Sequence, residues 1–462
     1  MIFAAPLRPI SGILLTLSLG VATGSTDPLR AAEPAHWAHA QTPPMGWNSY
    51  DAYGSSVTEH EFLANATYVK DHLLPHGYNI VVVDFRWADA TAADYDPNGI
   101  GGPLHADEFG RLLPAPNRFP SASDGQGFKP LADRVHGMGL KFGIHVMRGI
   151  PRQVVTANTP IEKSPFRAAD AANTKSTCKW CPDMWGIDAG TQAGQDYYDS
   201  VFRLYASWGV DFVKVDDLSY PYHEKEVEAV RRAIDRCGRP MIFSTSPGAT
   251  PPGKAPHVAD HANMWRISSD FWDRWRDLDR SLDLADAWQK TGVAGPGRWP
   301  DGDMIPLGRI GIRSGHGKDR RTHFTPDEQV TLLTHFAMMP SPLMLGMSLT
   351  DNDARTLELI THPGILGINQ DKLGRPGRRV LKNENKTEVW LRALADGDQA
   401  VALYNRGEEA AEITLTLTNL DLEGFWSAHD VWSGTPADPA SASVTRTLPP
   451  HGAVLLRLRP VR

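Results

Sequence analysis

The chain has 462 residues, of which 41% are hydrophobic, and 47 basic and 54 acidic side chains give a formal net charge of -7. This length and apolar content exclude a disordered or fibrous protein and allow roughly two or three domains. The charges are spread along the chain, so no basic patch for nucleic acid or for an anionic membrane is indicated. A neutral or weakly charged ligand fits better.

The N-terminal segment predicts a secretory signal peptide. Arg8 precedes an apolar run over residues 10–21, and small residues follow at 22–24. The run is too short and too rich in Gly and Ser for a membrane span, although an uncleaved anchor is the alternative. We therefore expect residues 1–35 to be signal peptide and leader. The mature protein would be exported, to a periplasm or outside the cell, with no membrane contact.

From residue 42 to 375, short apolar runs alternate with amphipathic stretches, which is typical of βα units around a parallel sheet. Eight such units predict an α/β fold, a closed (β/α)8 TIM barrel. An open doubly wound sheet is the alternative, but no G-x-G-x-x-G follows the first strand. The expected strands are Met45–Tyr50, Tyr78–Trp87, Leu140–Gly149, Val210–Asp217, Arg239–Gly248, Met264–Asp270, Asp303–Gly308 and Ser341–Leu349.

Two of the intervening helices have clear start signals. Thr58 and Glu61 form a capping box, and Thr325 is followed by a first-turn Pro326 and by its capping partner Glu328. Each pattern predicts a helix that begins at the residue after the threonine.

After about residue 376 the sequence pattern changes to short runs in which apolar and polar residues alternate, separated by turns such as 395–398 and 405–408. This spacing predicts an antiparallel β-sandwich domain over residues 376–462. The expected strands are Glu388–Leu394, Gln399–Asn405, Ala411–Thr418, Ala428–Gly434 and Gly452–Pro460.

Three cysteines are present, Cys178, Cys181 and Cys237. In an exported protein the C-x-x-C spacing of the first two favours a short-loop disulfide. A zinc site would need two further ligands with matching spacing, and there is no second C-x-x-C. Cys237, at the end of a helical pattern, is expected to be a buried free thiol.

Charged side chains stand at the ends of several predicted strands. In a (β/α)8 barrel these ends meet at the active-site face. A single acid there is often a helix cap, but acids on four strands favour one shared pocket. The residues are Asp84, His145, Lys214, Asp216, Asp217, Arg266, Asp270, Asp301 and Asp303.

Paired carboxylates without metal-ligand spacing favour glycoside cleavage, in which one acid attacks the anomeric carbon and the other transfers a proton. We expect Lys214 to hold Asp216 ionised, which suits a nucleophile. Asp270, between Trp265 and the pair Phe271–Trp272, would have an apolar environment that keeps a carboxyl protonated and suits the acid/base.

Seven segments of the chain resemble, in the same order, the motifs of glycoside hydrolase family 27, the α-galactosidase or melibiase family. The resemblance covers about residues 42–377, and the C-terminal β-domain is also of the family's type. The segments GIHVMRGIPR and FSTSPG are closer to a branch that includes plant enzymes with β-L-arabinopyranosidase as well as α-galactosidase activity. The seven segments are TPPMGWNSYDAYG, VVVDFRW, GLKFGIHV, VDFVKVDD, MWRISSD, RWPDGDM and GINQDKLG.

The resemblance implies a retaining mechanism with Asp216 as nucleophile and Asp270 as acid/base, their carboxyl groups about 5 to 5.5 Å apart. It implies no metal and no cofactor. The expected substrate-binding residues are Trp47, Tyr50, Asp84, His145, Lys214, Arg266 and Asp303.

Two departures from the family pattern leave the choice of substrate open. Many members carry adjacent aspartates where this chain has Asp84 and Phe85, and a glutamate where strand five offers only serine and threonine at 244–246. β-L-arabinopyranose has the ring configuration of α-D-galactose and lacks only the C6 hydroxymethyl group. We expect release of terminal α-D-galactose from small-molecule or polysaccharide galactosides, with β-L-arabinopyranosides, or both sugars, as the alternative.

Other interpretations remain for the whole chain and for three of its parts. A barrel that binds carbohydrate without cleaving it would be favoured if Asp216 or Asp270 were replaced, but both are present. A metal-dependent hydrolase would need an H-x-H or H-E-x-x-H motif, which this sequence does not contain. His145 is either a pocket residue or a core histidine, and Asp217 either supports Lys214 or caps a helix. The basic loop 313–321 is expected to be solvated, with leaving-group contact as the alternative, and the oligomeric state stays open.

Overall fold

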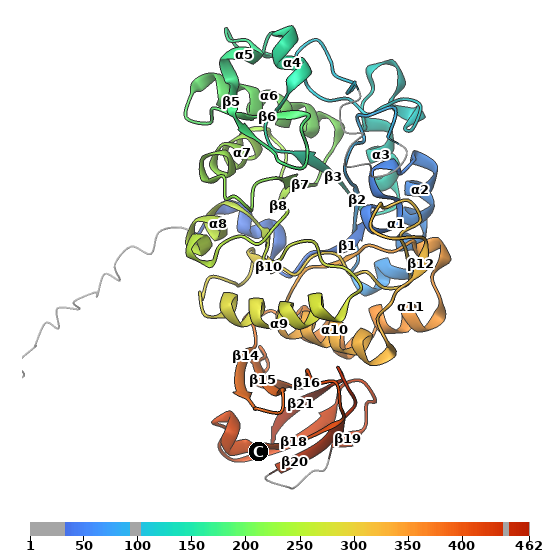
Figure 1. The fold of residues 1–462 in the computed structure, drawn as a ribbon, viewed down its shortest axis with the longest axis vertical. Coiled ribbons are helices and arrows are strands. Elements are labelled where there is room, and N and C mark those ends of the chain that lie inside the picture. Colours follow the sequence, from blue (N-terminus) through green and yellow to red (C-terminus); the bar gives the residue numbers. More distant parts are fainter. Residues whose placement is uncertain (1–32, 93–102, 438–442, 462) are drawn as a thin grey trace, which may run out of the picture. The chain divides into compact units, whose positions relative to one another are not determined.

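Eight parallel strands form the central sheet in the order β10-β9-β8-β7-β3-β2-β1-β13. A parallel bridge between Ile305 and Leu345 joins the two ends of this order, so the sheet closes into the expected barrel, visible as a ring in Figure 1. The bounds are β1 Met45–Asn48, β2 Ile80–Val83, β3 Lys141–Met147, β7 Phe212–Asp216, β8 Ile242–Thr245, β9 Met264–Arg266, β10 Trp299–Asp301 and β13 Leu343–Leu345.

This computed structural model describes residues 33–92, 103–437 and 443–461. Residues 35–462 form one compact unit. The expected signal peptide lies, apart from its last few residues, outside the described part of the chain. No helix within the described ranges combines the length and the apolar character that a membrane crossing requires.

Both faces of the barrel sheet are buried, which explains why its strands are nearly continuous apolar runs. Along β2, Ile80 and Val82 join a small cluster of buried residues that includes Phe212 and Met344 from other strands. Val81 and Val83 belong instead to the large core that also contains the helices. Because side chains alternate along a strand, one set fills the barrel and the other packs outward.

Helices surround the ring of strands (Figure 1). Both capping predictions are confirmed, since capping boxes are present at Thr58 with Glu61 and at Thr325 with Glu328. The helices are α1 Tyr50–Tyr53, α2 Glu59–Tyr68, α3 Lys129–Gly137, α4 Arg152–Ala157, α5 Ala168–Ala171, α6 Gln192–Trp208, α7 Glu224–Arg236, α8 Ala255–His261, α9 Trp275–Gln289, α10 Pro326–Met338, α11 Ala354–Ile360 and α12 Pro363–Asn369.

The seventh barrel strand differs from its predicted position. It was expected to begin at Asp303, but β10 covers Trp299–Asp301, and Asp303 has a positive φ of 90°. The chain therefore turns at Asp303 before Ile305 makes the closing bridge to β13. The apolar residues after the turn suggested a strand, but in the structure they are buried and make only the closing bridge through Ile305.

An inserted three-stranded sheet follows β3 and consists of β4 Ile150–Pro151, β5 Ala172–Thr177 and β6 Met184–Ile187. The segment between β5 and β6 carries Cys178, Trp180 and Cys181. All three pack in one cluster with Phe85. The insertion therefore adds an aromatic side chain next to the end of β2.

The C-terminal region has a six-stranded sheet, β14-β15-β16-β21-β18-β19, and a two-stranded sheet, β17-β20. Their apolar faces share a separate core, as the predicted β-sandwich requires. β14 and β20 were not predicted from the sequence, because their exposed polar residues hide the alternation of apolar and polar side chains. The strands are β14 Arg378–Lys382, β15 Thr387–Ala393, β16 Gln399–Asn405, β17 Ala411–Thr416, β18 Phe425–Asp430, β19 Pro436–Ala437, β20 Ser443–Leu448 and β21 Ala453–Val461; β11 Arg309–Ile310 and β12 Arg320–Arg321 form a hairpin elsewhere.

Candidate active site

A cavity lies at the carboxyl ends of the barrel strands, and seven of the nine residues predicted to form the site line it. His145 lies behind Asp216, and Trp47 is directed away from the cavity into the core. The lining residues are Tyr50, Asp51, Asp84, Phe85, Trp180, Lys214, Asp216, Pro247, Arg266, Asp270, Phe271, Trp272, Asp303, Met304 and His316.

Asp216 is the last residue of β7, and its side chain is only 10% exposed. His145 Nε2 lies 2.8 Å from Asp216 Oδ2, and the Ser246 hydroxyl donates to Oδ1 at 2.6 Å. Burial by itself raises the pKa of the Asp216 carboxyl, but contact with His145, the Lys214 charge and the Ser246 hydroxyl outweigh it and lower that pKa below its usual value. Asp216 is therefore a buried carboxylate that stays ionised.

Lys214 makes its direct contact with Asp84 and not with Asp216. Its Nζ lies 3.1 Å from Asp84 Oδ2, which also accepts a 2.7 Å hydrogen bond from Asn48. Burial opposes ionisation of Asp84, yet Lys214, His145 and Asn48 together lower the pKa of Asp84 to about 2. The sequence expectation that Lys214 holds Asp216 ionised is thus only partly right, because the partners in contact with Asp216 are His145 and Ser246.

Arg266, from the end of β9, joins two acids at the cavity wall. Its Nη2 lies 2.7 Å from Asp303 Oδ2 and 3.2 Å from Asp270 Oδ1. Asp303 is buried and also accepts a 2.9 Å hydrogen bond from the Phe271 backbone N–H. Burial and the neighbouring Asp270 raise the pKa of Asp303 even though Arg266 opposes the shift.

Asp270 has a more open environment than the sequence analysis expected. Its side chain is 51% exposed, whereas Trp265 is fully buried and does not line the cavity. Phe271 and Trp272 do line it. The predicted apolar enclosure of Asp270 is therefore wrong, and this carboxyl lies where solvent and a departing group can reach it.

Asp217 takes neither of its two predicted roles. Arg148, just after β3, donates from Nη2 to Asp217 Oδ2 at 2.6 Å and from Nη1 to Glu226 Oε1 at 2.6 Å. The Tyr198 hydroxyl donates to the other oxygen of Glu226 at 2.6 Å. This buried network connects the end of β7 to α6 and α7, and it holds the backbone directly after Asp216.

Several cavity residues were not predicted from the sequence, and three of them have polar or aromatic side chains. Asp51 follows the Tyr50 motif by one position, Trp180 lies between two cysteines, and His316 belongs to the loop predicted to be solvated. His316 stacks on Trp272 at 4.8 Å, so this loop reaches the cavity instead of being only solvated. Each of the three arrives from a segment outside the barrel strands, where strand-end reasoning does not apply.

The predicted disulfide is not formed, because Cys178, Cys181 and Cys237 are all free thiols in the structure. Cys178 and Cys181 are buried beside Phe85. Burial raises the pKa of the Cys181 thiol to about 12 and that of Cys178 above its usual value. Both therefore act as packing residues behind the cavity wall, and Cys237 is a half-buried thiol.

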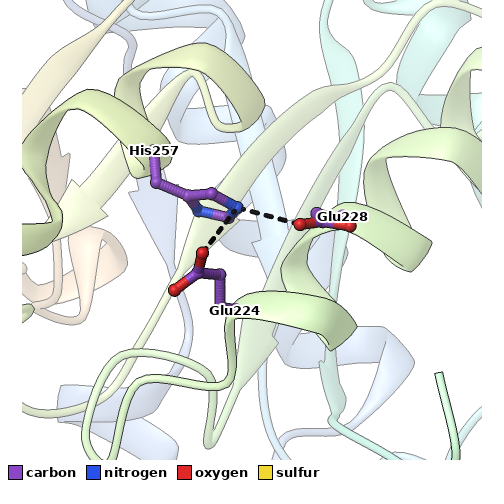
Figure 2. A group of neighbouring side chains, drawn as sticks. All are labelled: Glu224, Glu228 and His257. Carbon is purple, nitrogen blue, oxygen red and sulfur yellow. Dashed lines mark hydrogen bonds and ion pairs between the residues drawn. The ribbon is translucent and has the colours of Figure 1, made fainter. Parts of the chain in front are cut away.

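One group of metal-ligand side chains stands out in the described ranges, and it lies away from the cavity. Glu224 and Glu228 on α7 face His257 on α8 (Figure 2), with His257 Nε2 at 3.9 and 3.3 Å from their Oε1 atoms. Lys254 Nζ lies 2.5 Å from Glu224 Oε2, and Arg232 Nη1 lies 3.2 Å from Glu228 Oε2. Because protein cations already balance both carboxylates, hydrogen bonds and ion pairs account for this cluster.

Comparisons with known proteins agree with this geometry. Residues 183–371 match the model of the family described as alpha galactosidase A, and residues 384–458 match that of the alpha galactosidase C-terminal beta sandwich domain. An α-galactosidase of Cyamopsis tetragonoloba is 29% identical over 91% of this chain and 87% of its own length. An α-galactosidase A of Cellvibrio japonicus is 28% identical over 96% of this chain and 99% of its own.

A solved structure gives a stronger match. The β-L-arabinopyranosidase of glycoside hydrolase family 27 from Geobacillus stearothermophilus is 46% identical, with a TM-score of 0.89, over 93% of this chain and 99% of that one. Its match spans both the barrel and the C-terminal sheets. With the cavity and its carboxylates in the same fold, the chain belongs to glycoside hydrolase family 27, the α-galactosidase family, and is a glycoside hydrolase.

Proposed function

We propose that this enzyme is a retaining exo-glycosidase that removes terminal β-L-arabinopyranosyl and α-D-galactopyranosyl residues. The observation that carries the proposal is the pair of carboxyl groups on one cavity in opposite surroundings. Asp216 is buried and kept ionised, and Asp270 is half exposed beside Arg266. The first suits a nucleophile, and the second suits a group that exchanges protons with solvent and leaving group.

The reaction has two steps. An oxygen of Asp216 attacks the anomeric carbon as the bond to the leaving oxygen breaks, and Asp270 gives its proton to that oxygen. Asp270, now a carboxylate, then takes a proton from water, whose oxygen attacks the same carbon and releases Asp216. The configuration is retained, and the two carboxyl groups are predicted to lie about 5 to 5.5 Å apart.

Two ion pairs on the cavity wall suit the sugar hydroxyl groups. Lys214 with Asp84, and Arg266 with Asp303, each present a charged donor next to a carboxylate acceptor. A hydroxyl group both donates and accepts, so each pair can satisfy it completely. The cavity therefore recognises hydroxyl positions by charge-assisted hydrogen bonds.

Phe85 favours the smaller sugar. It lines the cavity beside Asp84 and packs edge-on against Trp180, with ring centroids 5.8 Å apart. An apolar wall at this point accepts the C5 methylene of arabinopyranose but offers no partner to the hydroxymethyl group of galactose. A buried hydroxyl without a partner is costly. The similar solved structure is also named a β-L-arabinopyranosidase.

The test is kcat/KM on p-nitrophenyl β-L-arabinopyranoside and p-nitrophenyl α-D-galactopyranoside. We expect both to be cleaved with retention, the arabinopyranoside faster, and Asp216→Asn to lose more than about a thousandfold on each. Asp260→Asn, an exposed position on α8, is the matched control and should keep wild-type rates. Cleavage of neither sugar, or full activity of Asp216→Asn, would overturn the proposal.

We also propose that the enzyme works outside the cytoplasm. Arg8 and the apolar run that follows it support removal of a leader during export. Cell fractionation with N-terminal sequencing of the mature protein tests this, and recovery of the full-length chain from the cytoplasm would contradict it.

A further inference from the structure

Asp51 is a carboxyl group of the cavity that the mechanism above does not use. It is the second residue of the short helix α1, only 1% exposed, and it lines the cavity with Asp84 and Lys214. Its Oδ2 is completely buried and has no hydrogen-bond partner. Leaving a buried polar atom without a partner costs free energy, so this atom in the wall of the cavity needs an explanation.

The backbone around Asp51 fixes the position of this carboxyl. The Gly311 N–H donates to the Asp51 carbonyl at 2.8 Å. Gly346, just after β13, leaves the space that Oδ2 occupies, because a Cβ at this glycine would lie 1.9 Å from that oxygen. The carboxyl group is therefore held between a glycine backbone and the cavity.

The surroundings of Asp51 favour its neutral form. Burial has the largest effect, and the carboxyl groups of Asp303, Asp84 and Asp270 add to it, so the pKa of Asp51 lies well above its usual value although Lys214 opposes the shift. An ionised carboxylate would also leave Oδ2 as a buried charge without a donor, which is strongly unfavourable. These surroundings therefore favour the protonated form of Asp51.

We propose that Asp51 is a specificity-determining residue that binds one hydroxyl group of the sugar ring as a neutral carboxylic acid, through the oxygen that Gly346 does not enclose, whose O–H group can both donate and accept a hydrogen bond. This inference rests on the proposed function. Asp84, whose pKa is lowered, only accepts hydrogen bonds, and Lys214 and Arg266 only donate. Asp51 is thus an uncharged group in the cavity that can do both, and it selects sugars with a hydroxyl at its position.

The experiment measures sugar binding by calorimetry, without turnover. L-arabinose, D-galactose and the singly deoxygenated forms of D-galactose are titrated into wild type, Asp51→Leu and Asp51→Asn. Asp51→Leu should weaken L-arabinose and D-galactose binding about tenfold, and Asp51→Asn, which keeps a donor, by about threefold or less. One deoxy sugar, which lacks the hydroxyl that Asp51 binds, should be insensitive to Asp51→Leu. Asp260→Leu, at an exposed position on α8, is the matched control.

Each outcome decides the question. Unchanged binding by Asp51→Leu, or an equal loss for every deoxy sugar, would overturn the role of Asp51 while the proposed function stands. If wild type binds neither L-arabinose nor D-galactose, both proposals fail. Thermal unfolding of each variant shows whether it folds, and Asp51→Ala replaces Asp51→Leu if the larger side chain prevents folding.

Discussion

Asp216 and Asp51 are buried carboxyl groups of one cavity, and their surroundings favour opposite charge states. Asp216 has a hydroxyl donor and a histidine within 2.8 Å, so its carboxylate is stabilised. Asp51 Oδ2 has no donor and lies in the field of three other carboxyl groups. Burial opposes ionisation of both, and the neighbouring charges together with the hydrogen bonds decide which of them stays charged.

Ser246→Ala removes the 2.6 Å hydrogen bond to Asp216 Oδ1. A hydrogen bond to a charged group contributes about 1.5 to 3 kcal/mol, so we expect kcat/KM to fall about ten- to a hundredfold. Loss of this donor also raises the pKa of Asp216, and the acid limb of the pH profile should move to higher pH. Ser207→Ala, at an exposed hydroxyl on α6, is the matched control, and an unmoved acid limb would contradict the assignment.

Phe85→Asp introduces an acceptor into the apolar part of the cavity wall. We expect the ratio of kcat/KM for the galactoside to that for the arabinopyranoside to rise, because the new carboxylate can accept a hydrogen bond from the C6 hydroxyl. Phe85→Leu keeps the wall apolar and should leave the ratio near the wild-type value. A folded Phe85→Asp enzyme with an unchanged ratio would show that this wall does not choose between the sugars.

At the scale of elements, the end of β7 is held by contacts that come from other elements. Arg148 donates from its backbone N–H to the Asp216 carbonyl at 2.9 Å, and its side chain binds Asp217 and Glu226. Asp217 has a positive φ of 63°, so the chain turns sharply after Asp216. Arg148 is therefore a positioning residue for Asp216.

Arg148→Met would leave the carboxylates of Asp217 and Glu226 buried without their cation. We expect the free energy of unfolding to fall by about 3 to 5 kcal/mol, and kcat to fall more than KM changes. Arg236→Met is the matched control, since Arg236 pairs with Asp199 at the surface and should contribute less than about 1 kcal/mol. Urea unfolding and steady-state kinetics of both variants check this, and similar losses in the two would rule out a special role for Arg148.

At the scale of the whole molecule, buried titratable groups divide into two sets with opposite effects on stability. Burial first of all raises the pKa values of Asp51, Asp301 and Asp303. Burial also lowers those of His36 and His335 to about 3. The carboxyl groups with raised pKa values do not reduce the free energy of unfolding at low pH, where they are protonated in both states, and they reduce it as the pH rises above about 4. The histidines with lowered pKa values do not reduce it above about pH 6.5, where they are neutral in both states, and they reduce it as the pH falls below that value.

The pH dependence of stability follows from these shifts. A buried carboxyl group with a raised pKa keeps its proton in the folded chain after the unfolded chain has lost it at about pH 4. It therefore lowers the free energy of unfolding as the pH rises from about 4 to its folded pKa, which is about 7 for Asp303. The buried histidines act in the opposite direction below about pH 6.5, so the effect of one carboxyl group is measured by comparing a variant with wild type. We expect the free energy of unfolding of Asp51→Asn, which cannot ionise, to increase relative to that of wild type from about pH 4 to about pH 7, as measured with urea. A difference that stays constant or decreases would contradict the raised pKa of Asp51.

Much of the fold followed from local pattern. Both capping boxes and most of the barrel strands were predictable, because apolar runs and helix caps are properties of neighbouring residues. The polar strands β14 and β20 were not, since their exposed polar residues hide the alternation of apolar and polar side chains. The turn at Asp303 was missed because its conformation is set where the barrel closes, at a bridge between residues far apart in the chain.

The sequence by itself determined which acids gather at the active-site face, since a parallel barrel brings all strand ends to one side. Asp84, Asp216, Asp270 and Asp303 were found in this way. Only the tertiary structure decided the environment of each acid: the partners of Asp216, the openness of Asp270, and the carboxyl of Asp51. Burial and hydrogen bonding depend on residues that are far apart in the chain, so charge state and specificity emerge only when the barrel is closed.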